Sequence, residues 1–234
     1  ENLVFLRPLG LRLPPRGRFS GRPGLHRIRA LCKALGDPQD RLRFVHLAGT
    51  NGKGSTATMI ASALQAAGLR TGLYTSPYLV QFYERIRIDG SMISSDDLAH
   101  FSERVAVACE SLTLPEGETI GEFEFTTAVA FLYFVDQGCD IVVLETGLGG
   151  RCDATNVIHA LGEKTFVAQC DLHHGGTWAG SEDNLRHGLS PVFVYNDGSP
   201  AAQALAQRGA ELLNAAPVSL AILQSEQLSI FDGI

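Results

Sequence analysis

Hydrophobic and polar residues follow one another along this chain in short blocks that predict an α/β fold. Residues 42–48 form an apolar, β-prone run that ends at Gly49. Residues 55–67 have the spacing of a helix, which is expected to end at Gly68 because glycine readily adopts the left-handed conformation that follows many helices. Residues 71–75 form a second short apolar run. A strand, a glycine-rich turn, a helix and a strand in this order are typical of a βαβ unit with a parallel sheet.

The middle of the chain continues this pattern. Residues 85–89 alternate isoleucine with charged residues, so one side of this segment is expected to face solvent. A helix is expected to begin at Ser94 or Ser95, because serine caps helix N-termini, and to run to about Leu112.

The remaining segments complete the predicted sheet. Residues 125–134 predict an apolar helix that ends near Gly138, and residues 140–145 form the clearest buried strand of the chain. A last strand–helix–strand unit is predicted at residues 191–195, 201–213 and 217–223. The sequence therefore predicts a mostly parallel sheet flanked by helices.

Composition and charge narrow the classes of partner. The net charge of -6 argues against nucleic acids and anionic membranes, which select for clustered Lys and Arg. Residues 7–29 are a local exception with seven arginines, best interpreted as a solvated N-terminal arm. The five cysteines lack C-x-x-C spacing, which favours free thiols in a reducing compartment over a zinc site. Since no signal peptide or membrane-spanning run is visible, we expect a cytoplasmic protein.

The strongest chemical signal is the segment Gly49-Thr50-Asn51-Gly52-Lys53-Gly54-Ser55, which lies between the first predicted strand and helix. Glycines let backbone N–H groups converge on phosphate oxygens, the helix adds the positive end of its dipole, and Lys53 adds a positive charge. The segment differs from the template G-x-x-x-x-G-K-[ST], because Gly54 separates the lysine from the hydroxyl residue. We predict a nucleotide phosphate site, with a tight turn that merely exposes Lys53 as the alternative.

Four sequence motifs occur in an order and at a spacing that resemble those of a known enzyme family. They are AGTNGKGS (Ala48–Ser55), YTSPYLV (Tyr74–Val80), ERIRIDG (Glu84–Gly90) and LETGLGGRCDATN (Leu144–Asn156). Over roughly residues 18–158 the chain resembles the folylpolyglutamate and dihydrofolate synthases, a branch of the Mur ligase superfamily. The resemblance implies an N-terminal arm (1–17) and an incomplete ATP-binding Mur ligase central domain (18–234) with a P-loop-type sheet, without the family's Rossmann-like C-terminal domain.

The resemblance also implies a reaction. Family members use ATP and Mg²⁺ to phosphorylate a folate or pteroate carboxylate, and the amine of glutamate then attacks the acyl phosphate to form an amide. The partners implied are therefore small molecules, namely folate or dihydropteroate and glutamate, with no nucleic acid or membrane, and the enzyme is expected to be a monomer. Lys53 and Glu145 would be catalytic, and the segment from Gly49 to Ser55 would bind ATP.

Metal and substrate residues follow from the same resemblance. The metal ligands would be Ser76, Glu145 and His173, although Glu145 could instead be an ordinary surface carboxylate and Ser76 a turn-forming residue before proline. The residues expected on the substrate side are Phe123, Arg151, Cys152, Asp153 and Ala154. The alternatives are that Phe123 serves packing alone and that Arg151 and Asp153 pin their loop by a salt bridge.

The chain departs most strongly from the family between His159 and Ser190. Relatives have there a histidine that binds a second Mg²⁺ and a carbamylated lysine. His173 or His174 is a replacement for that histidine, unless the pair is incidental in a polar loop, and the lysine position holds His187 or no equivalent. The alternative function is therefore a truncated or diverged homologue that binds ATP or folate without turnover.

Overall fold

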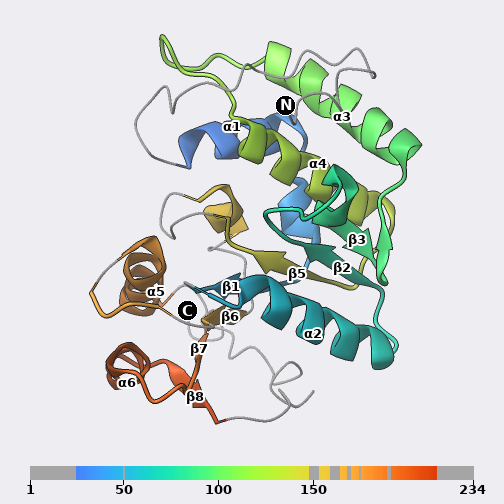
Figure 1. Cartoon of the computed structure of the whole chain (residues 1–234). Coiled ribbons are helices and arrows are strands. Elements are labelled where there is room, and N and C mark those ends of the chain that lie inside the picture. Colours follow the sequence, from blue (N-terminus) through green and yellow to red (C-terminus); the bar gives the residue numbers. More distant parts are fainter. Residues whose placement is uncertain are drawn as a thin grey trace, which may run out of the picture.

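The protein, described by a computed structural model over residues 25–49, 51–147, 153–158, 164–167, 170–173, 175–188 and 191–214, is built on one large sheet. The sheet has eight strands in the order β4-β3-β2-β5-β1-β6-β7-β8 (Figure 1). Pairing is parallel from β2 across to β8, whereas β3 and β4 add an antiparallel edge. The predicted mostly parallel α/β fold is confirmed.

The elements have the following bounds. The strands are β1 (Phe44–Ala48), β2 (Thr71–Tyr74), β3 (Ile86–Ile88), β4 (Ser91–Met92), β5 (Ile141–Glu145), β6 (Lys164–Val167), β7 (Val192–Tyr195) and β8 (Glu211–Leu213). The α-helices are α1 (His26–Ala34), α2 (Lys53–Ala66), α3 (Ser95–Glu110), α4 (Glu122–Asp136), α5 (Gly175–His187) and α6 (Pro200–Gln207). Short 3₁₀ helices occur at η3 (Pro38–Arg41), η4 (Phe82–Arg85) and η5 (Ala154–Ile158).

Helices cover both faces of the central strands, which explains why β1 and β5 are apolar without alternation. Phe44 and Leu144 belong to a core shared with α1, α3 and α4, whereas their strand neighbours Val45 and Val143 pack on the opposite face against α2. A third cluster joins β6 and β7 to α5 and α6, around the buried Trp178. Figure 1 shows α2 on one side of the strands and α1, α3 and α4 on the other.

Glycines end the helices where the sequence predicts it, and in one place where it does not. Gly68 has a φ of 86°, and its N–H donates to the Gln65 carbonyl at 2.9 Å, so the predicted cap is confirmed. The helix predicted over 201–213 is too long. It ends at Gln207, because Gly209 adopts a φ of 108° and ends the helix in the same way.

The residues after Gly209 form a strand instead of continuing the helix. β8 pairs with β7, with Glu211 opposite Phe193, so the strand–helix–strand order is correct but its last strand lies earlier than predicted. The strand predicted at 217–223 and the N-terminal arm lie outside the described residues. The divergent stretch between His159 and Ser190 contributes β6 and α5, with β6 placed directly beside β1.

The other predicted elements are also present. Ser94 caps α3 by accepting a hydrogen bond from the Asp97 N–H at 3.0 Å, as expected of a serine at this position. The apolar helix predicted over 125–134 forms the middle of α4, and Gly138 follows its end with a φ of 64°. Within the described residues, no helix is both long and apolar enough to span a bilayer.

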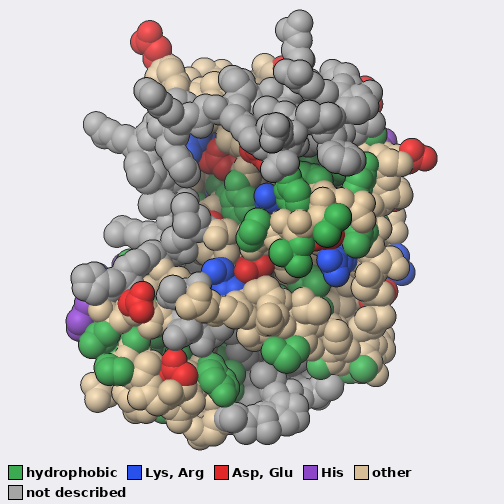
Figure 2. Space-filling model, in the orientation of Figure 1, with side chains coloured by type: hydrophobic (Ala, Val, Ile, Leu, Met, Phe, Trp, Pro, Cys, Tyr) green, Lys and Arg blue, Asp and Glu red, His purple; other side chains and the backbone are tan. Residues whose placement is uncertain are grey.

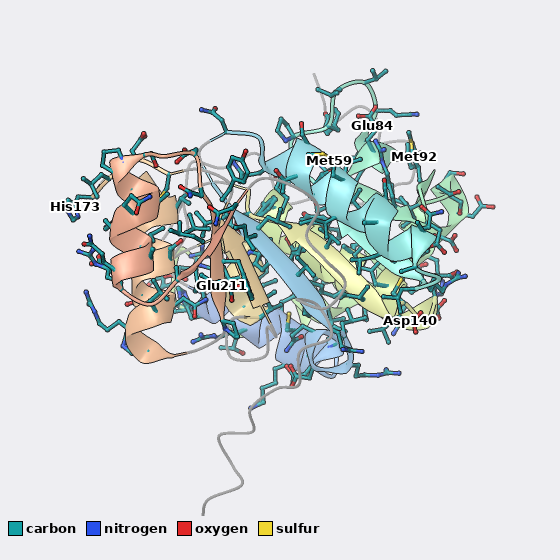
Figure 3. All side chains as sticks on the ribbon, turned by 90° about the horizontal axis from the view of Figure 1, so that it is seen from below. Met59, Glu84, Met92, Asp140, His173 and Glu211 are labelled. Carbon is teal, nitrogen blue, oxygen red and sulfur yellow. The ribbon has the colours of Figure 1, made fainter. Side chains whose placement is uncertain are left out.

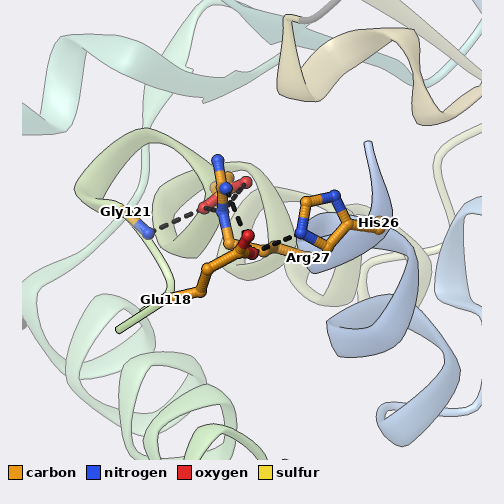
Figure 4. A network of polar contacts seen from close by, with 5 residues as sticks. His26, Arg27, Glu118 and Gly121 are labelled. Carbon is orange, nitrogen blue, oxygen red and sulfur yellow. Dashed lines mark hydrogen bonds and ion pairs between the residues drawn. The ribbon is translucent and has the colours of Figure 1, made fainter. Parts of the chain in front are cut away.

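A buried ionic cluster fastens α1 to the start of α4 (Figure 4). Arg27 donates from Nε to both carboxylate oxygens of Glu124, at 3.1 and 3.3 Å, and Glu124 also accepts the Gly121 N–H at 2.7 Å. Glu118 pairs with Arg27 at 3.5 Å and with His26, whose hydrogen bond lowers the pKa of the Glu118 carboxyl. These contacts hold α1 and the N-terminus of α4 together.

Candidate functional site

The loops that carry the predicted chemistry meet at one edge of the sheet. Parallel pairing aligns the ends of the three central strands, with Leu47 of β1 opposite Glu145 of β5 and Leu144 opposite Tyr74 of β2. The chain therefore leaves β1, β2 and β5 on the same side, which is where ligands bind in open parallel sheets. Figure 2 shows basic and acidic side chains next to each other in the middle of this face of the molecule.

The phosphate segment leads directly into α2, which begins two residues earlier than predicted. Gly52 precedes the helix with a φ of 74° and has no side chain to cap it, and the first helical hydrogen bond is from the Thr56 N–H to the Gly52 carbonyl at 2.9 Å. The preceding N–H groups, including that of Gly54, therefore have no partner within the helix and suit an anion. Lys53 is half-buried at the start of this turn, and Thr50 lies outside the described residues.

Glu145 lies against this helix N-terminus rather than on an open surface. Its side chain is buried, at 4% exposure, so the alternative of an ordinary surface carboxylate is wrong. A Cβ atom at Gly54 would lie 3.4 Å from Oε2 and 3.6 Å from Oε1 of Glu145. These distances are in the range of ordinary van der Waals contact, so the Glu145 carboxylate lies directly beside the first turn of α2.

The electrostatic state of Glu145 depends on competing effects. Burial raises the pKa of its carboxyl, while the Ser76 N–H and the positive charge of Lys53 act in the opposite direction. The influence of Lys53 shows that the two residues predicted to be catalytic share one environment. A buried carboxylate that is incompletely compensated favours a cation, and carboxylate oxygen is a preferred ligand of Mg²⁺.

Of the other predicted metal ligands, one lies beside Glu145 and one is elsewhere. The Ser76 N–H donates to Oε2 of Glu145 at 2.9 Å, and a cis peptide bond links Ser76 to Pro77. His173 is exposed and packs edge-on against Trp178, with ring centroids 4.8 Å apart, at the outer edge of the molecule in Figure 3. Its neighbour at position 174 lies outside the described residues. No group of three or more His, Cys, Asp or Glu side chains fit for a metal occurs in the described ranges, so a ligand role for His173 stays a prediction.

The residues after β5 form a buried polar network that the sequence reasoning missed. His46, in the middle of β1 and 2% exposed, has its Nε2 2.9 Å from the hydroxyl oxygens of both Thr146 and Thr155. The Thr155 hydroxyl donates in turn to Oδ1 of Asp153 at 2.5 Å. Because a hydroxyl has only one proton, Thr155 accepts from a protonated Nε2 of His46. The one available signal was a histidine inside an otherwise apolar strand.

The predicted substrate residues divide into described and undescribed ones. Asp153 and Ala154 are buried, at 6% and 5% exposure, and Asp153 also accepts the Thr155 N–H at 3.0 Å. Asp153 therefore pins its own loop through Thr155, while the predicted salt bridge to Arg151 stays a prediction. Arg151 and Cys152 lie outside the described residues.

Phe123 packs on Gly147, the second residue after β5. A Cβ atom at Gly147 would come within 2.6 Å of the Phe123 ring, so a side chain at this position is incompatible with the packing. The ring also lies 5.9 Å from that of Tyr74, whose hydroxyl is 3.2 Å from that of Thr127 and whose pKa burial raises to about 12. These contacts support the packing alternative, while contact with a substrate stays a prediction.

Comparisons with known proteins agree with this geometry. No family model matches the chain. The dihydrofolate synthase/folylpolyglutamate synthase of Bacillus subtilis is 45% identical over 145 residues, which are 62% of this chain and 34% of that protein. The folylpolyglutamate synthase of Lacticaseibacillus casei is 46% identical over 133 residues, which are 56% of this chain and 31% of that protein.

Solved structures extend the similarity further along the chain. Folylpolyglutamate synthase from Thermotoga maritima superposes with a TM-score of 0.71 at 32% identity, over 91% of this chain and 49% of that chain. A solved structure described as an FPGS–AMPPCP–folate complex, where FPGS is folylpolyglutamate synthase, superposes with a TM-score of 0.72 at 33% identity. The match covers 91% of this chain and 53% of that chain. The chain thus spans about a third of the length of these curated relatives and about half of the solved chains. It is a homologue of the folylpolyglutamate and dihydrofolate synthases and shares their Mur-ligase-like fold.

Proposed function

We propose that this chain supplies the ATP-binding part of a ligase that joins the carboxylate of a folate or dihydropteroate to glutamate through an acyl phosphate. The observation that carries the proposal is the position of the buried Glu145 carboxylate against Gly54, in the first turn of the helix that follows the phosphate segment. A nucleotide site needs both features, because phosphate binding requires N–H donors and a lysine while the cation requires a carboxylate.

Under this proposal, the start of α2 binds phosphate and the end of β5 binds the metal ion. The N–H groups at the start of α2 and the ammonium of Lys53 bind phosphate oxygens and stabilise the negative charge that accumulates during phosphoryl transfer. Glu145 and Ser76 would hold Mg²⁺, and their oxygen atoms are ligands of the type that this ion prefers. When bound, the ion would offset phosphate charge and make the carboxylate oxygen easier to phosphorylate.

The residues that would flank a bound substrate are also fixed by packing and hydrogen bonds. Phe123 covers Gly147, and the His46 network fixes Asp153 and Thr155 next to the end of β5. A rigid apolar and polar wall of this kind would hold a bound carboxylate in one orientation, which is the main requirement for a two-substrate reaction. Contacts of Phe123, Asp153 and Ala154 with the folate or dihydropteroate belong to this proposal.

Under the same proposal the partners are small molecules, and the protein acts as a monomer in the cytoplasm. The cysteines described by the structure, Cys32, Cys109, Cys139 and Cys170, are free thiols, which suits a reducing compartment. Burial raises the pKa values of all of these thiols, to about 11 or 12, so they are unreactive at neutral pH.

Binding without turnover is the second candidate, and one observation favours it. His187, at the position expected for the family's lysine, lies at the end of α5, where its Nδ1 is 2.9 Å from the Asp183 carbonyl oxygen and its side chain is exposed. Its described contacts include neither Glu145 nor Lys53. A chain without a functional equivalent of that lysine would bind ATP but release little ADP.

Calorimetry with Mg²⁺ and ATP tests the first part of the proposal. Lys53→Ala should weaken ATP binding at least tenfold, since a charge-assisted hydrogen bond to phosphate is worth about 1.5–3 kcal/mol. Lys33→Ala, which removes an exposed lysine of α1, is the matched control and should bind as the parent does. Equal affinity of the parent and Lys53→Ala would remove the phosphate site. ADP release with dihydropteroate or tetrahydrofolate and glutamate then separates turnover from binding alone.

A further inference from the structure

The segment that joins β2 to β3, residues 75–85, carries a motif to which no role has been assigned so far. Its first part contains Ser76, and its last part contains Glu84, the first residue of the ERIRIDG signature. Glu84 lies on η4 and is 8% exposed, although it has a carboxylate. A buried carboxylate outside the catalytic residues requires a physical reason.

The contacts of Glu84 supply that reason. Its Oε2 accepts the Leu79 N–H at 2.8 Å, and its Oε1 accepts the N–H groups of Val80 and Gln81 at 3.1 and 3.0 Å. One side chain therefore satisfies the backbone donors of three successive residues. These hydrogen bonds lower the pKa of the Glu84 carboxyl, with the Leu79 N–H as the largest cause, so the group is ionised at neutral pH.

Side chains on either side of residues 79 and 80 make the other contacts of this segment. The Tyr78 and Phe82 rings lie 5.9 Å apart, the Arg85 guanidinium lies 5.2 Å from the Tyr78 ring, and the Gln81 amide donates to the Met92 sulfur at 3.4 Å. The side chains of Leu79 and Val80 are 90% and 84% exposed, so apolar packing does not fix their backbone. The base of the segment is closed by a hydrogen bond from the Thr75 N–H to the Arg85 carbonyl at 3.0 Å. Between that base and the tip lies Ser76, whose N–H is bound to Glu145. Phe82 and Tyr78 thus anchor the segment to the core, whereas the backbone of residues 79–81 is held by the Glu84 carboxylate and that of Ser76 by Glu145.

We propose that Glu84 is a positioning residue for the metal site, because its carboxylate fixes the backbone of residues 79–81 and thereby keeps Ser76 beside Glu145. The inference deepens the proposed function and rests on it, since Ser76 and Glu145 bind Mg²⁺ only if that function is correct. The hydrogen bonds of Glu84 go to the backbone of residues 79–81 and not to Ser76 or Glu145, so it acts through the chain that follows Ser76.

The chemistry explains why a carboxylate is needed at this position. Three N–H groups converge on two oxygen atoms, and a carboxylate has acceptor sites for all of them without a hydrogen of its own. In Glu84→Gln the amide nitrogen would face an N–H group, so at least one of the three hydrogen bonds is lost while size and shape are kept. Glu84→Asp keeps the charge but is one methylene shorter, so it reaches fewer of the donors.

Two measurements on the same variant test the inference. Hydrogen exchange should be faster at the amides of residues 79–81 in Glu84→Gln than in the parent. The affinity for Mg²⁺, titrated in the presence of ATP, should fall about 10–100-fold, the usual effect of losing an outer partner of a metal ligand. Ser76→Ala should weaken Mg²⁺ binding in the parent but add little in Glu84→Gln, because Ser76 is then already misplaced.

A matched control separates positioning from general loss of stability. Asp140→Asn removes another carboxylate that accepts a backbone N–H, that of Arg70 at 2.7 Å. Asp140 and Glu84 lie far apart in Figure 3, and Asp140 precedes the first residue of β5 whereas Glu145 is its last. The control variant should leave Mg²⁺ affinity within about twofold of the parent.

Each outcome decides the question. Unchanged exchange at residues 79–81, or Mg²⁺ affinity within twofold of the parent, in Glu84→Gln would overturn the inference alone. Failure of the parent to bind Mg²⁺ with ATP would overturn the proposed function, and the metal part of the inference with it. The hydrogen-exchange result would then still test whether Glu84 fixes the backbone of residues 79–81. If Glu84→Gln did not fold, Glu84→Asp would be measured in the same two ways, with a smaller change expected in each.

Discussion

The centre of the sheet and its β6–β8 wing use buried polar groups in different ways. At the centre, Glu145 at the carboxyl end of β5 and His46 in the middle of β1 are almost fully buried, and burial raises the pKa of Glu145. In the wing, the described buried polar groups are uncharged: Asn184 donates to the Thr165 hydroxyl at 3.0 Å, and the buried hydroxyl of Ser181 has no hydrogen-bond partner among the described residues. Among the described residues of the wing, no carboxylate is buried as Glu145 is. Glu182, which forms an ion pair with Arg208, is partly exposed.

This difference teaches where the fold is built for stability and where it is built for a ligand. A buried carboxylate whose charged form is disfavoured makes the folded state less stable at neutral pH. Such a group is typical of a functional site, where a bound ligand offsets the buried charge. The wing is instead stabilised by apolar packing around Trp178. Substitution of Trp178 in the wing should therefore change stability without changing ligand binding, whereas substitution of Glu145 at the centre should change ligand binding most.

The largest expected effect is on stability and comes from Trp178→Ala in the wing. Trp178 is 3% exposed, packs with β6, β7 and α6, and has the Arg208 guanidinium 5.2 Å from its ring. Removing the ring should lower the free energy of unfolding by about 3–5 kcal/mol, measured by denaturant titration. Trp178→Phe should cost less. An ATP affinity that fell in the folded Trp178→Phe variant would break the comparison, because the wing would then be part of the site.

Glu145→Gln should have the largest effect on binding. Loss of a ligand should cost at least as much as loss of an outer partner, so Mg²⁺ affinity in the presence of ATP should fall by about a hundredfold, or about 2.7 kcal/mol. The amide carbonyl oxygen of the substituted side chain would still accept the Ser76 N–H. The substitution therefore removes the negative charge and keeps the size and shape of the side chain. Unchanged Mg²⁺ affinity by calorimetry would contradict the centre's assignment as a metal site.

The same variant has an expected signature in the pH dependence of stability. Because the pKa of Glu145 is raised in the folded protein, its contribution to stability is fully present below the ordinary carboxyl pKa of 4.5 and is lost as the pH rises through the higher folded value. Without ligand, Glu145→Gln should therefore match the parent in thermal stability near pH 4 and exceed it at pH 7. Glu84→Gln should show the opposite trend, with its deficit greatest at neutral pH, because the pKa of Glu84 is lowered.

Gly147→Ala should have an intermediate effect. The new methyl group would overlap the Phe123 ring, since the Cβ position is 2.6 Å from the ring. Overpacking of this kind costs about 1–3 kcal/mol of stability, measured by thermal or denaturant unfolding. Phe123→Leu in the same chain should restore part of the loss. Additive effects of the two substitutions would show that Phe123 does not pack on Gly147 in solution.

The sequence was sufficient for the elements whose signals are local. The apolar run of β1, the glycine after α2, the Ser94 cap and the apolar run of β5 each lie within a few residues, and each is confirmed. The end of α6 was missed for a local reason as well, because the helical pattern continues past Gly209. A single glycine can be tolerated within a helix, and the pairing of β8 with β7 decides the outcome here.

The site could be predicted only in part because its contacts are not local. Lys53 and Glu145 were both predicted, but the sequence pattern does not show that the Glu145 carboxylate, at the end of β5, lies directly beside Gly54. His46 was visible as a histidine in an apolar strand, yet its partners Thr146 and Thr155 are 100 and 109 residues away. Such partners follow from strand order and register, which the pattern of hydrophobic residues does not fix.

The smallest expected effect is that of His173→Ala, and it is also the most direct test of the boundary between the two regions. His173 is exposed, and its ring centroid lies 4.8 Å from that of Trp178, so its removal should change the free energy of unfolding by no more than about 0.5 kcal/mol. Mg²⁺ affinity in the presence of ATP should stay within about twofold of the parent, since Glu145 and Ser76 are unchanged. A tenfold loss would instead mean that the loop before α5 reaches the metal when ATP is bound. In that case the third ligand suggested by the family resemblance would be real, and the wing would contribute to the site.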